Sequence, residues 1–544
     1  MVRNALLGLW ISMVALILSP ALFASETLLV NGRIYTANPA RKWAQAIAIT
    51  GTRIDAVGTN EEIMSRRESG SRIIDLQQRT VIPGIVDSHT HLWLGALALH
   101  GFNLATPDLY VEPKDEAAFV AKIKEYAASH PNDKVLFGRA QFPNTASRAL
   151  LDRAVSNRPI VIHAPTEHTL WVNTKALELA GITDRPNADP VIESFIIRDA
   201  NRQPTGVLRE SAMLLMDHAL ANQPFEEKVA WMREASRYMN RFGVTSVTNA
   251  TGSLEEIQVY AALRDRGELT VRTKTSFATV AVNHSLTPEF MADLDKARTT
   301  YNDRWVSGNL IKFFADGAGT PGLYKPEDYR NLILELDKRG YQIMTHSLSA
   351  GPATMVLDAY EEAIRVNGPR DRRFRVEHAI NIAPADVPRF AKLGVTLSMQ
   401  PEFCCNTNPA TNVWQSYLKS GANLAFGSDW PCTFPPDPFS GIQQAVTRSV
   451  KAIFAAPDPT AVRQYASPDE RMTVEQAVDA YTRGGAYARF SEDYTGSLDA
   501  GKEADLAVLT QDIFTVRPEE IGNTQVVMTM VGGRIVFDQM KLRK

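Results

Sequence analysis

The sequence predicts an α/β protein: a TIM (β/α)8 barrel with a small β-sandwich built from both chain ends and a long insertion after barrel strand 1. Eight apolar runs alternate with helix-length amphipathic segments in the middle of the chain. Short strand-turn-strand patterns lie at both ends. The gap between the first two apolar runs is too long for one crossover. A doubly wound sheet is the alternative, although it would not usually need eight strands.

The size and composition of the chain narrow its class. With 544 residues, it is long for one compact domain, which favours one large domain and a smaller one. Hydrophobic residues make up 44% and charged residues 22%, as in soluble globular proteins. The net charge is -3 and no basic tract is present, so we expect no nucleic-acid partner.

The first 24 residues have the features of a signal peptide. Arg3 supplies positive charge, an apolar stretch follows from Ala5 to Leu18, and small residues allow cleavage at Ala21 to Ala24. The alternative is an uncleaved membrane anchor, but the apolar stretch is short for spanning a membrane. We therefore expect a periplasmic or secreted protein with no stable membrane association after signal cleavage.

The β-sandwich is expected from residues 25–80 and 495–544. Two segments read as hairpins in the first part, residues 26–35 around Asn31-Gly32 and residues 46–57 around Gly51. Residues 504–509 and 526–537 provide further strands, the last pair around Gly532-Gly533.

The barrel is expected over residues 81–494, with the insertion at about 100–225. Helices are predicted at 226–242 and 353–366, and the insertion has strand-like segments at 191–198 and 205–208. A long insertion over the catalytic end of a barrel commonly forms a lid. The eight predicted barrel strands are residues 82–86, 244–249, 272–279, 310–315, 342–346, 374–378, 395–400 and 424–429.

Several candidate ligands fall at the carboxyl ends of these strands, where TIM barrels carry their active sites. Alternate residues of a strand share a face, so His89 and His91 point the same way and can hold one metal ion. Each histidine alone is better explained as a core, loop or surface residue, but their placement on separate strand ends together indicates a site. The other candidates are Lys312, His346, His378 and Asp429.

Ordered motifs over nearly the whole mature chain resemble the amidohydrolase superfamily, in its YtcJ-like (amidohydrolase family 3) branch. The motifs are Pro83-Gly-Ile-Val-Asp-Ser-His-Thr-His91, Ile311-Lys-Phe-Phe-Ala-Asp-Gly317, Thr345-His346, Arg375-Val-Glu-His378, Gln400-Pro401, Phe426-Gly-Ser-Asp-Trp-Pro431, Trp171-Val-Asn-Thr-Lys-Ala-Leu177, Gly206-Val-Leu-Arg-Glu210 and Gly496-Ser-Leu-Asp-Ala-Gly-Lys-Glu-Ala-Asp-Leu506.

The resemblance implies a hydrolase of non-peptide carbon–nitrogen bonds, acting on an amide, N-formyl or related small substrate. One or two divalent ions, with zinc suiting the ligands best, would activate water and polarise the substrate carbonyl. Asp429 would be the general base, and Glu377 a supporting residue. The resemblance also implies a carbamylated Lys312 bridging two ions; an unmodified lysine, or a single-metal site in which Asp316 only shapes the turn, is the alternative. The metal ligands would be His89, His91, Lys312, His346, His378 and Asp429.

Substrate identity stays open because the loop residues differ from the family pattern. Ser347 follows His346 where Gly-Asp is usual, and residues 318–324 lack the usual Ser-rich, Arg-containing sequence. The alternative functions are an esterase or isomerase on the same barrel, or a non-catalytic binding protein. The sequence does not indicate whether the chain is a monomer or a homo-oligomer. Trp93, Trp171, Tyr324, Phe403 and Trp430 form either an aromatic pocket or plain packing, and Cys404, Cys405 and Cys432 either a disulfide or passive thiols.

Overall fold

The computed structural model describes residues 26–540, apart from 105–115, 144, 166–167, 214, 217–222, 279–285, 318–321, 404–411, 434, 452–461 and 465–467. The predicted signal peptide and the Cys404–Cys405 pair therefore lie outside the described residues. None of the described helices is both long and apolar enough to span a bilayer.

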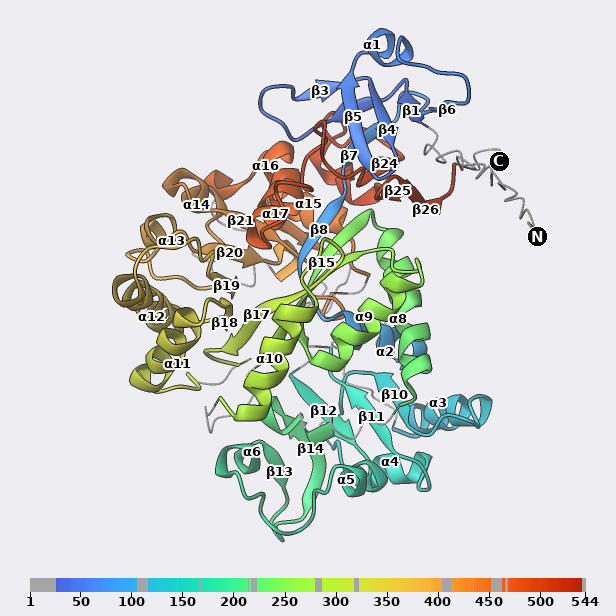
Figure 1. Cartoon of the computed structure of the whole chain (residues 1–544). Coiled ribbons are helices and arrows are strands. Elements are labelled where there is room, and N and C mark those ends of the chain that lie inside the picture. Colours follow the sequence, from blue (N-terminus) through green and yellow to red (C-terminus); the bar gives the residue numbers. More distant parts are fainter. Residues whose placement is uncertain are drawn as a thin grey trace, which may run out of the picture.

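The middle of the chain forms an eight-stranded parallel sheet that curves into a barrel, which confirms the predicted TIM barrel (Figure 1). The two end strands meet through backbone hydrogen bonds just beyond them, Asp429 N–H to His89 O (2.7 Å) and His91 N–H to Trp430 O (2.8 Å). In order, the strands are β8 (Ile85–Thr90), β15 (Val244–Gly252), β16 (Arg272–Ala278), β17 (Val306–Phe314), β18 (Gln342–Ser347), β19 (Arg375–His378), β20 (Thr396–Met399) and β21 (Leu424–Phe426).

Helices cover the outside of the barrel, and the predicted helices at 226–242 and 353–366 are confirmed as α8 and α12. Their ends follow from local chemistry: Ser253 caps α9, and Thr287 caps α10 ahead of a proline at the first position. The helices are α2 (Leu92–His100), α8 (Phe225–Asn240), α9 (Leu254–Asp265), α10 (Pro288–Thr300), α11 (Pro326–Lys338), α12 (Ala350–Asn367), α13 (Val387–Leu393), α14 (Trp414–Ser420), α15 (Pro438–Thr447), α16 (Val474–Asp479) and α17 (Gly485–Ala488).

The first predicted strand was placed wrongly. The apolar run from Val81 to Val86 is shared between two sheets: β7 (Thr80–Pro83) belongs to the small β unit, and the barrel strand β8 starts only at Ile85. Gly84 lies between them, and a Cβ there would come within 2.2 Å of the Thr245 hydroxyl oxygen. The position where the chain passes from one sheet to the other is a glycine, because a side chain there would collide with Thr245.

Strands from both chain ends make up the small β unit. One sheet has the order β26-β25-β24-β7-β2-β3, and a second sheet has the order β5-β4-β1-β6. Both sheets contribute to one apolar cluster that includes Leu29, Ile47, Val81, Leu506 and Met528. The strands are β1 (Thr27–Val30), β2 (Arg33–Tyr35), β3 (Trp43–Ala44), β4 (Ala46–Thr50), β5 (Arg53–Gly58), β6 (Arg72–Asp75), β24 (Leu506–Leu509), β25 (Val526–Val531) and β26 (Arg534–Asp538); the short helix α1 is Asn60–Met64.

Two of the predicted hairpins are present and one is not. β4 pairs with β5 around Gly51, and β25 pairs with β26 around Gly532-Gly533, both antiparallel. The hairpin predicted at Asn31-Gly32 is wrong, because β1 and β2 enter different sheets. The Asn-Gly pair here turns the chain from one sheet to the other instead of joining neighbouring strands.

The insertion carries its own mixed sheet, of order β13-β14-β12-β11-β10-β9 (Figure 1). The strand predicted from Val191 is wrong at its start, because residues 190–194 are helical and only Ile196–Arg198 form a strand. Its elements are β9 (Phe102–Asn103), α3 (Glu116–Ser129), β10 (Leu136–Arg139), α4 (Arg148–Ala154), β11 (Ile160–His163), β12 (Thr169–Val172), α5 (Thr174–Leu179), α6 (Pro190–Ser194), β13 (Ile196–Arg198) and β14 (Pro204–Arg209); a hairpin of β22 (Ser449–Lys451) and β23 (Val462–Gln464) follows α15.

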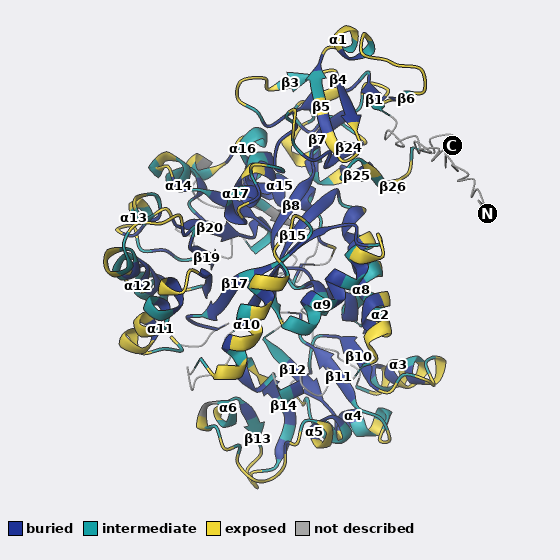
Figure 2. Ribbon diagram, viewed as in Figure 1, coloured by how far each residue is buried: buried dark blue, intermediate teal, exposed yellow. Residues whose placement is uncertain are grey.

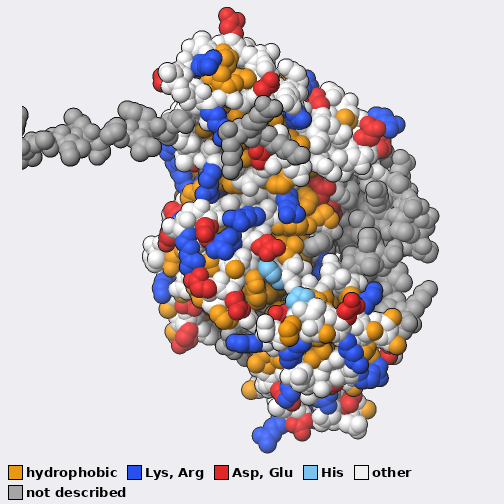
Figure 3. All heavy atoms as spheres, turned by 90° about the vertical axis from the view of Figure 1, so that its right-hand side faces the viewer, with side chains coloured by type: hydrophobic (Ala, Val, Ile, Leu, Met, Phe, Trp, Pro, Cys, Tyr) orange, Lys and Arg blue, Asp and Glu red, His pale blue; other side chains and the backbone are white. Residues whose placement is uncertain are grey.

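The barrel strands are buried, whereas the surrounding helices expose one side to solvent (Figure 2). A buried ion pair ties the barrel to the small β unit: Arg272 of β16 lies 2.8 Å from Asp505 and 3.0 Å from Glu503. On the face in Figure 3, acidic and basic side chains are interspersed, in keeping with the small net charge.

Candidate metal centre

The His-x-His pair lies at the carboxyl end of β8. His89 is fully buried, and His91 follows the strand with 13% of its side chain exposed. His89 Nδ1 lies 2.5 Å from Glu377 Oε2, and His91 Nδ1 lies 2.5 Å from Thr251 Oγ1. These contacts fix both rings and leave each Nε2 for another partner.

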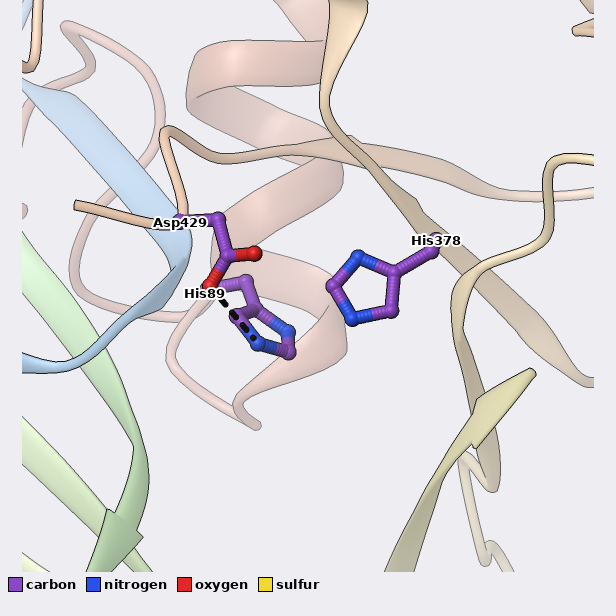
Figure 4. A group of neighbouring side chains, drawn as sticks. All are labelled: His89, His378 and Asp429. Carbon is purple, nitrogen blue, oxygen red and sulfur yellow. Dashed lines mark ion pairs between the residues drawn. The ribbon is translucent and has the colours of Figure 1, made fainter. Parts of the chain in front are cut away.

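Asp429 faces both Nε2 atoms. Its Oδ1 lies 3.1 Å from His91 Nε2 and 3.4 Å from His89 Nε2, the second contact being dashed in Figure 4. The prediction placed Asp429 inside strand eight, but β21 ends at Phe426, and Asp429 has a left-handed backbone with φ 55°. Ser428 holds this turn by donating its backbone N–H to Asp87 (3.0 Å). The carboxylate is therefore aimed by a strained turn and not by strand geometry.

His378 completes a group of three possible ligands. Each of His89, His378 and Asp429 offers a ligand atom, and these atoms lie within 4.8 Å of one another (Figure 4). The ring of His378 is oriented by Gln400, whose Oε1 lies 2.7 Å from Nδ1. His378 has φ 68° at the end of β19, so backbone strain occurs at two of the three positions.

His346 lies next to this group but not within it. Its ring centroid is 4.6 Å from that of His378, and its Nε2 is 3.5 Å from Asp316 Oδ1. Asp316 accepts backbone N–H groups from Leu348 (3.0 Å) and Ser349 (2.9 Å), so it also shapes the loop after β18.

Lys312 extends into the barrel from β17. Its Nζ lies 3.5 Å from His89 Nε2 and 4.9 Å from the centre of the Phe314 ring. Burial lowers the pKa of Lys312 to about 8, although nearby Glu377 and Asp429 oppose this shift. A substantial fraction of this amine is therefore neutral at slightly alkaline pH.

A buried ion pair supports His89 from behind. Arg375 contacts both oxygens of Glu377, at 2.8 Å and 2.9 Å, and donates to the backbone oxygen of Ser88 at 2.6 Å. All of these groups are buried. Glu377 thus neutralises the buried guanidinium of Arg375 and accepts a hydrogen bond from Nδ1 of His89.

The protonation states suit a cation. Burial lowers the pKa of His89 and His346 well below the usual value, and that of His378 to about 4, so these imidazoles are neutral. Burial alone would raise the pKa of Asp429; positive charge on His89 and a hydrogen bond from His91 would bring it far below its usual range, and with the imidazoles neutral that positive charge would come from a bound cation. Because Nδ1 of His89 and His378 donates to an oxygen, Nε2 of each carries a lone pair near the carboxylate.

Unsatisfied atoms point to the same conclusion. Asp429 Oδ1 and His346 Nε2 are buried and have no hydrogen bond of ordinary geometry among the described residues. Several lone pairs and one negative charge thus meet in a buried space, which costs free energy unless a cation lies between them. The donor set fits a divalent metal ion.

The aromatic side chains divide between site and core. Phe403 lies near the site, its ring centroid 6.1 Å from that of His378. Trp171 is fully buried in the insertion and stacks on Phe119, and Trp430 is fully buried and stacks on Tyr238. The packing alternative therefore holds for both tryptophans. Trp93 packs against Trp231, and Tyr324 packs against Phe313 and Tyr329.

Two residues that sequence reasoning did not assign to the site come from the insertion. His168 lies with its ring centroid 5.6 Å from that of His346, and its Nδ1 lies 3.0 Å from Glu210. Glu210 ends the Gly206–Glu210 motif, so the sequence did carry a signal. Only the folded insertion brings that motif to the mouth of the barrel.

Known proteins resemble the chain over nearly its whole length. The Amidohydrolase family pattern matches residues 72–537. The N-substituted formamide deformylase of Arthrobacter pascens is 25% identical, covering 94% of this chain and 98% of its own. The putative amidohydrolase YtcJ of Bacillus subtilis is 27% identical, covering 94% and 99%. An uncharacterized metal-dependent hydrolase from Pyrococcus horikoshii has the same fold, with a TM-score of 0.71, 21% identity and coverage of 91% and 99%. The chain therefore belongs to the amidohydrolase family.

Proposed function

We propose that this protein hydrolyses a non-peptide C–N bond, that of an amide or N-formyl group, in a small organic substrate. The observation that carries the proposal is the buried convergence of His89, His378 and Asp429 on one point, with neutral imidazoles beside an ionised carboxylate. The Arthrobacter pascens relative is an N-substituted formamide deformylase, and this directs the choice of test substrates.

One or two divalent ions would be held by His89, His91, Lys312, His346, His378 and Asp429, and zinc suits this nitrogen and oxygen set best. When bound, such an ion activates water and polarises the substrate carbonyl. Glu377 keeps the Nδ1 proton on His89 and Gln400 keeps it on His378, so both rings present Nε2.

Asp429 is the proposed general base. Its Oδ1 is buried between two imidazoles and has no competing hydrogen-bond donor of ordinary geometry among the described residues. The carboxylate would take the proton of the attacking water and return it to the nitrogen of the leaving amine.

Lys312 is proposed to carry a carbamate. The neutral amine forms a bond to the carbon of CO2 and releases a proton, which converts a cation into an anionic oxygen ligand. The pKa of about 8 favours this step, because only the neutral amine is nucleophilic.

The cellular setting belongs to the same proposal. We infer a periplasmic or secreted enzyme from the signal-like residues 1–24, with a small-molecule substrate and no nucleic-acid partner. Fractionation of cells expressing the full chain tests export, and sedimentation of the purified protein decides between a monomer and a homo-oligomer.

The test is hydrolysis of a panel of N-substituted formamides and simple amides in water enriched in oxygen-18. We expect the label in the carboxylate product, and loss of hydrolysis in His89→Ala and Asp429→Asn. Asp184→Asn, an exposed acid in the insertion, is the matched control and keeps full activity. Undiminished hydrolysis in both site variants rejects the proposal, and products without the label indicate isomerisation instead.

A further inference from the structure

His168 and Glu210 of the insertion lie side by side at one end of the β12–β14 strand pair. β12 and β14 are antiparallel with Thr169 opposite Arg209, and His168 and Glu210 lie one residue beyond this pair. The backbone N–H of Glu210 donates to the oxygen of His168 at 3.2 Å. The two side chains therefore start from paired backbone positions on a rigid sheet.

The side chains of this pair are joined as well. His168 Nδ1 lies 3.0 Å from Glu210 Oε2, with 22% of the histidine and 11% of the glutamate side chain exposed. Since a carboxylate accepts, Nδ1 carries a proton, and the adjacent negative charge stabilises the imidazolium form, in which Nε2 is a second N–H donor for a partner outside the pair. Glu210 has φ 41°, a left-handed conformation that costs free energy in a non-glycine residue. Strain of this kind concentrates at functional sites.

The pair faces the metal centre. The His168 ring lies against that of His346, and the charges of Asp429 and Lys312 act on it. Arg139 donates to Pro165 O at 2.8 Å and, more weakly, to Cys432 O at 3.4 Å. Arg139 thereby joins Pro165, at the end of the segment after β11, to the turn that follows Asp429.

We propose that His168, oriented by Glu210, contacts the substrate and donates a hydrogen bond from Nε2 to the substrate oxygen that gains negative charge during attack. This inference rests on the proposed hydrolysis of a carbonyl compound. The barrel would hold the reacting carbonyl from one side, and the insertion would supply a donor from the other. A donor aimed at a developing oxyanion is among the largest contributions to catalysis.

The chain offers a matched control for a purely structural histidine–glutamate pair. His100, at the end of α2, has its Nε2 3.2 Å from Glu234 Oε2, and 33% of its side chain is exposed. The His100 ring packs against Trp231 on the outside of the barrel. His100→Ala therefore removes a histidine that is paired with a glutamate without touching the candidate site.

The test uses inorganic phosphate as an oxyanion probe, titrated calorimetrically into the full-length zinc-loaded protein. Removing a hydrogen bond to a charged group weakens binding by about 10- to 100-fold, so we expect that rise in Kd for His168→Ala and His168→Asn. Glu210→Gln raises Kd less, because the amide oxygen still accepts from Nδ1. His100→Ala leaves Kd unchanged.

Two further readouts separate the roles. The zinc content and the visible spectrum of the cobalt-substituted protein stay unchanged in His168→Ala if the residue contacts substrate and not metal. Loss of metal, an unchanged phosphate Kd, or absence of phosphate binding to the zinc-loaded wild type overturns the proposal. If phosphate binds as expected and no amide or formamide is hydrolysed, the proposed function fails while the role of His168 in oxyanion binding stands.

Discussion

Glu377→Gln is the perturbation with the most specific consequence. Glu377 Oε2 accepts from His89 Nδ1 at 2.5 Å and from Arg375 at 2.9 Å, while Oε1 accepts from Arg375 at 2.8 Å. Glutamine has nearly the same shape but carries no charge. One of its two positions is an NH2 group, which cannot accept a hydrogen bond from His89 or from Arg375.

Two free-energy costs follow from this geometry. The guanidinium of Arg375 is fully buried, and leaving a buried charge without its partner costs about 3–5 kcal/mol of unfolding free energy. Losing the acceptor behind a metal-ligating histidine lowers metal affinity by about 10- to 100-fold. At about 1.4 kcal/mol per factor of ten, this second cost is about 1.4–2.8 kcal/mol.

The assay measures zinc affinity by competition with a chromophoric chelator, and unfolding in urea. Asp505→Asn is the matched control, because Asp505 is the buried partner of Arg272 in the small β unit, away from the candidate ligands. We expect both variants to lose stability and only Glu377→Gln to lose zinc affinity. Equal zinc affinities in the two variants would refute the role given to Glu377.

Burial raises the pKa of Glu402 to about 8, so the folded state retains a proton that the unfolded chain releases, and this group lowers the stability as the pH rises from about 4.5 to about 8. Burial also raises the pKa of Asp87 to about 7 and that of Asp437 to about 6, so Glu402→Gln reduces the fall in unfolding midpoint between pH 5 and pH 8 without abolishing it. A Cβ on Gly95 would lie 2.0 Å from the Trp430 ring, so Gly95→Ala costs about 1–3 kcal/mol in thermal unfolding. Gly351→Ala, with nothing within 4 Å of the new methyl, is neutral or stabilising. Lys312→Met keeps the side-chain length without the amine and lowers the metal bound per chain, as measured by elemental analysis in bicarbonate buffer.

Much of the barrel could be predicted from sequence because its signals are local. Strands such as β17 and β21 contain a short apolar run, and helices such as α8 and α11 have a clear amphipathic period. The predicted strand boundaries are wrong where one apolar stretch contributes strands to two different sheets. The run from Val81 to Val86 is uniformly apolar, and only the close approach of Gly84 to Thr245 divides it. Likewise, the Asn31-Gly32 turn is locally typical of a hairpin, and pairing partners distant in sequence decide otherwise.

The sequence indicates which candidate ligands lie at strand ends, but it does not indicate how their side chains are oriented or which residues support them. Periodicity places His89 and His91 on one face, yet it cannot show that Asp429 lies beyond the end of β21 in a left-handed turn. The Glu377 contact and the approach of His168 depend on residues more than 170 positions apart in the chain. Such contacts exist only once the barrel has closed and the insertion has docked.

Metal content per chain tests the central claim most directly. Protein purified without added metal or chelator should contain a divalent transition metal by elemental analysis, and His89→Ala should contain less. Two equivalents would support a bridging carbamate on Lys312, and one equivalent a single-metal site with Asp429 still the base. A chain that stays empty after loading with zinc, manganese and cobalt would contradict the account.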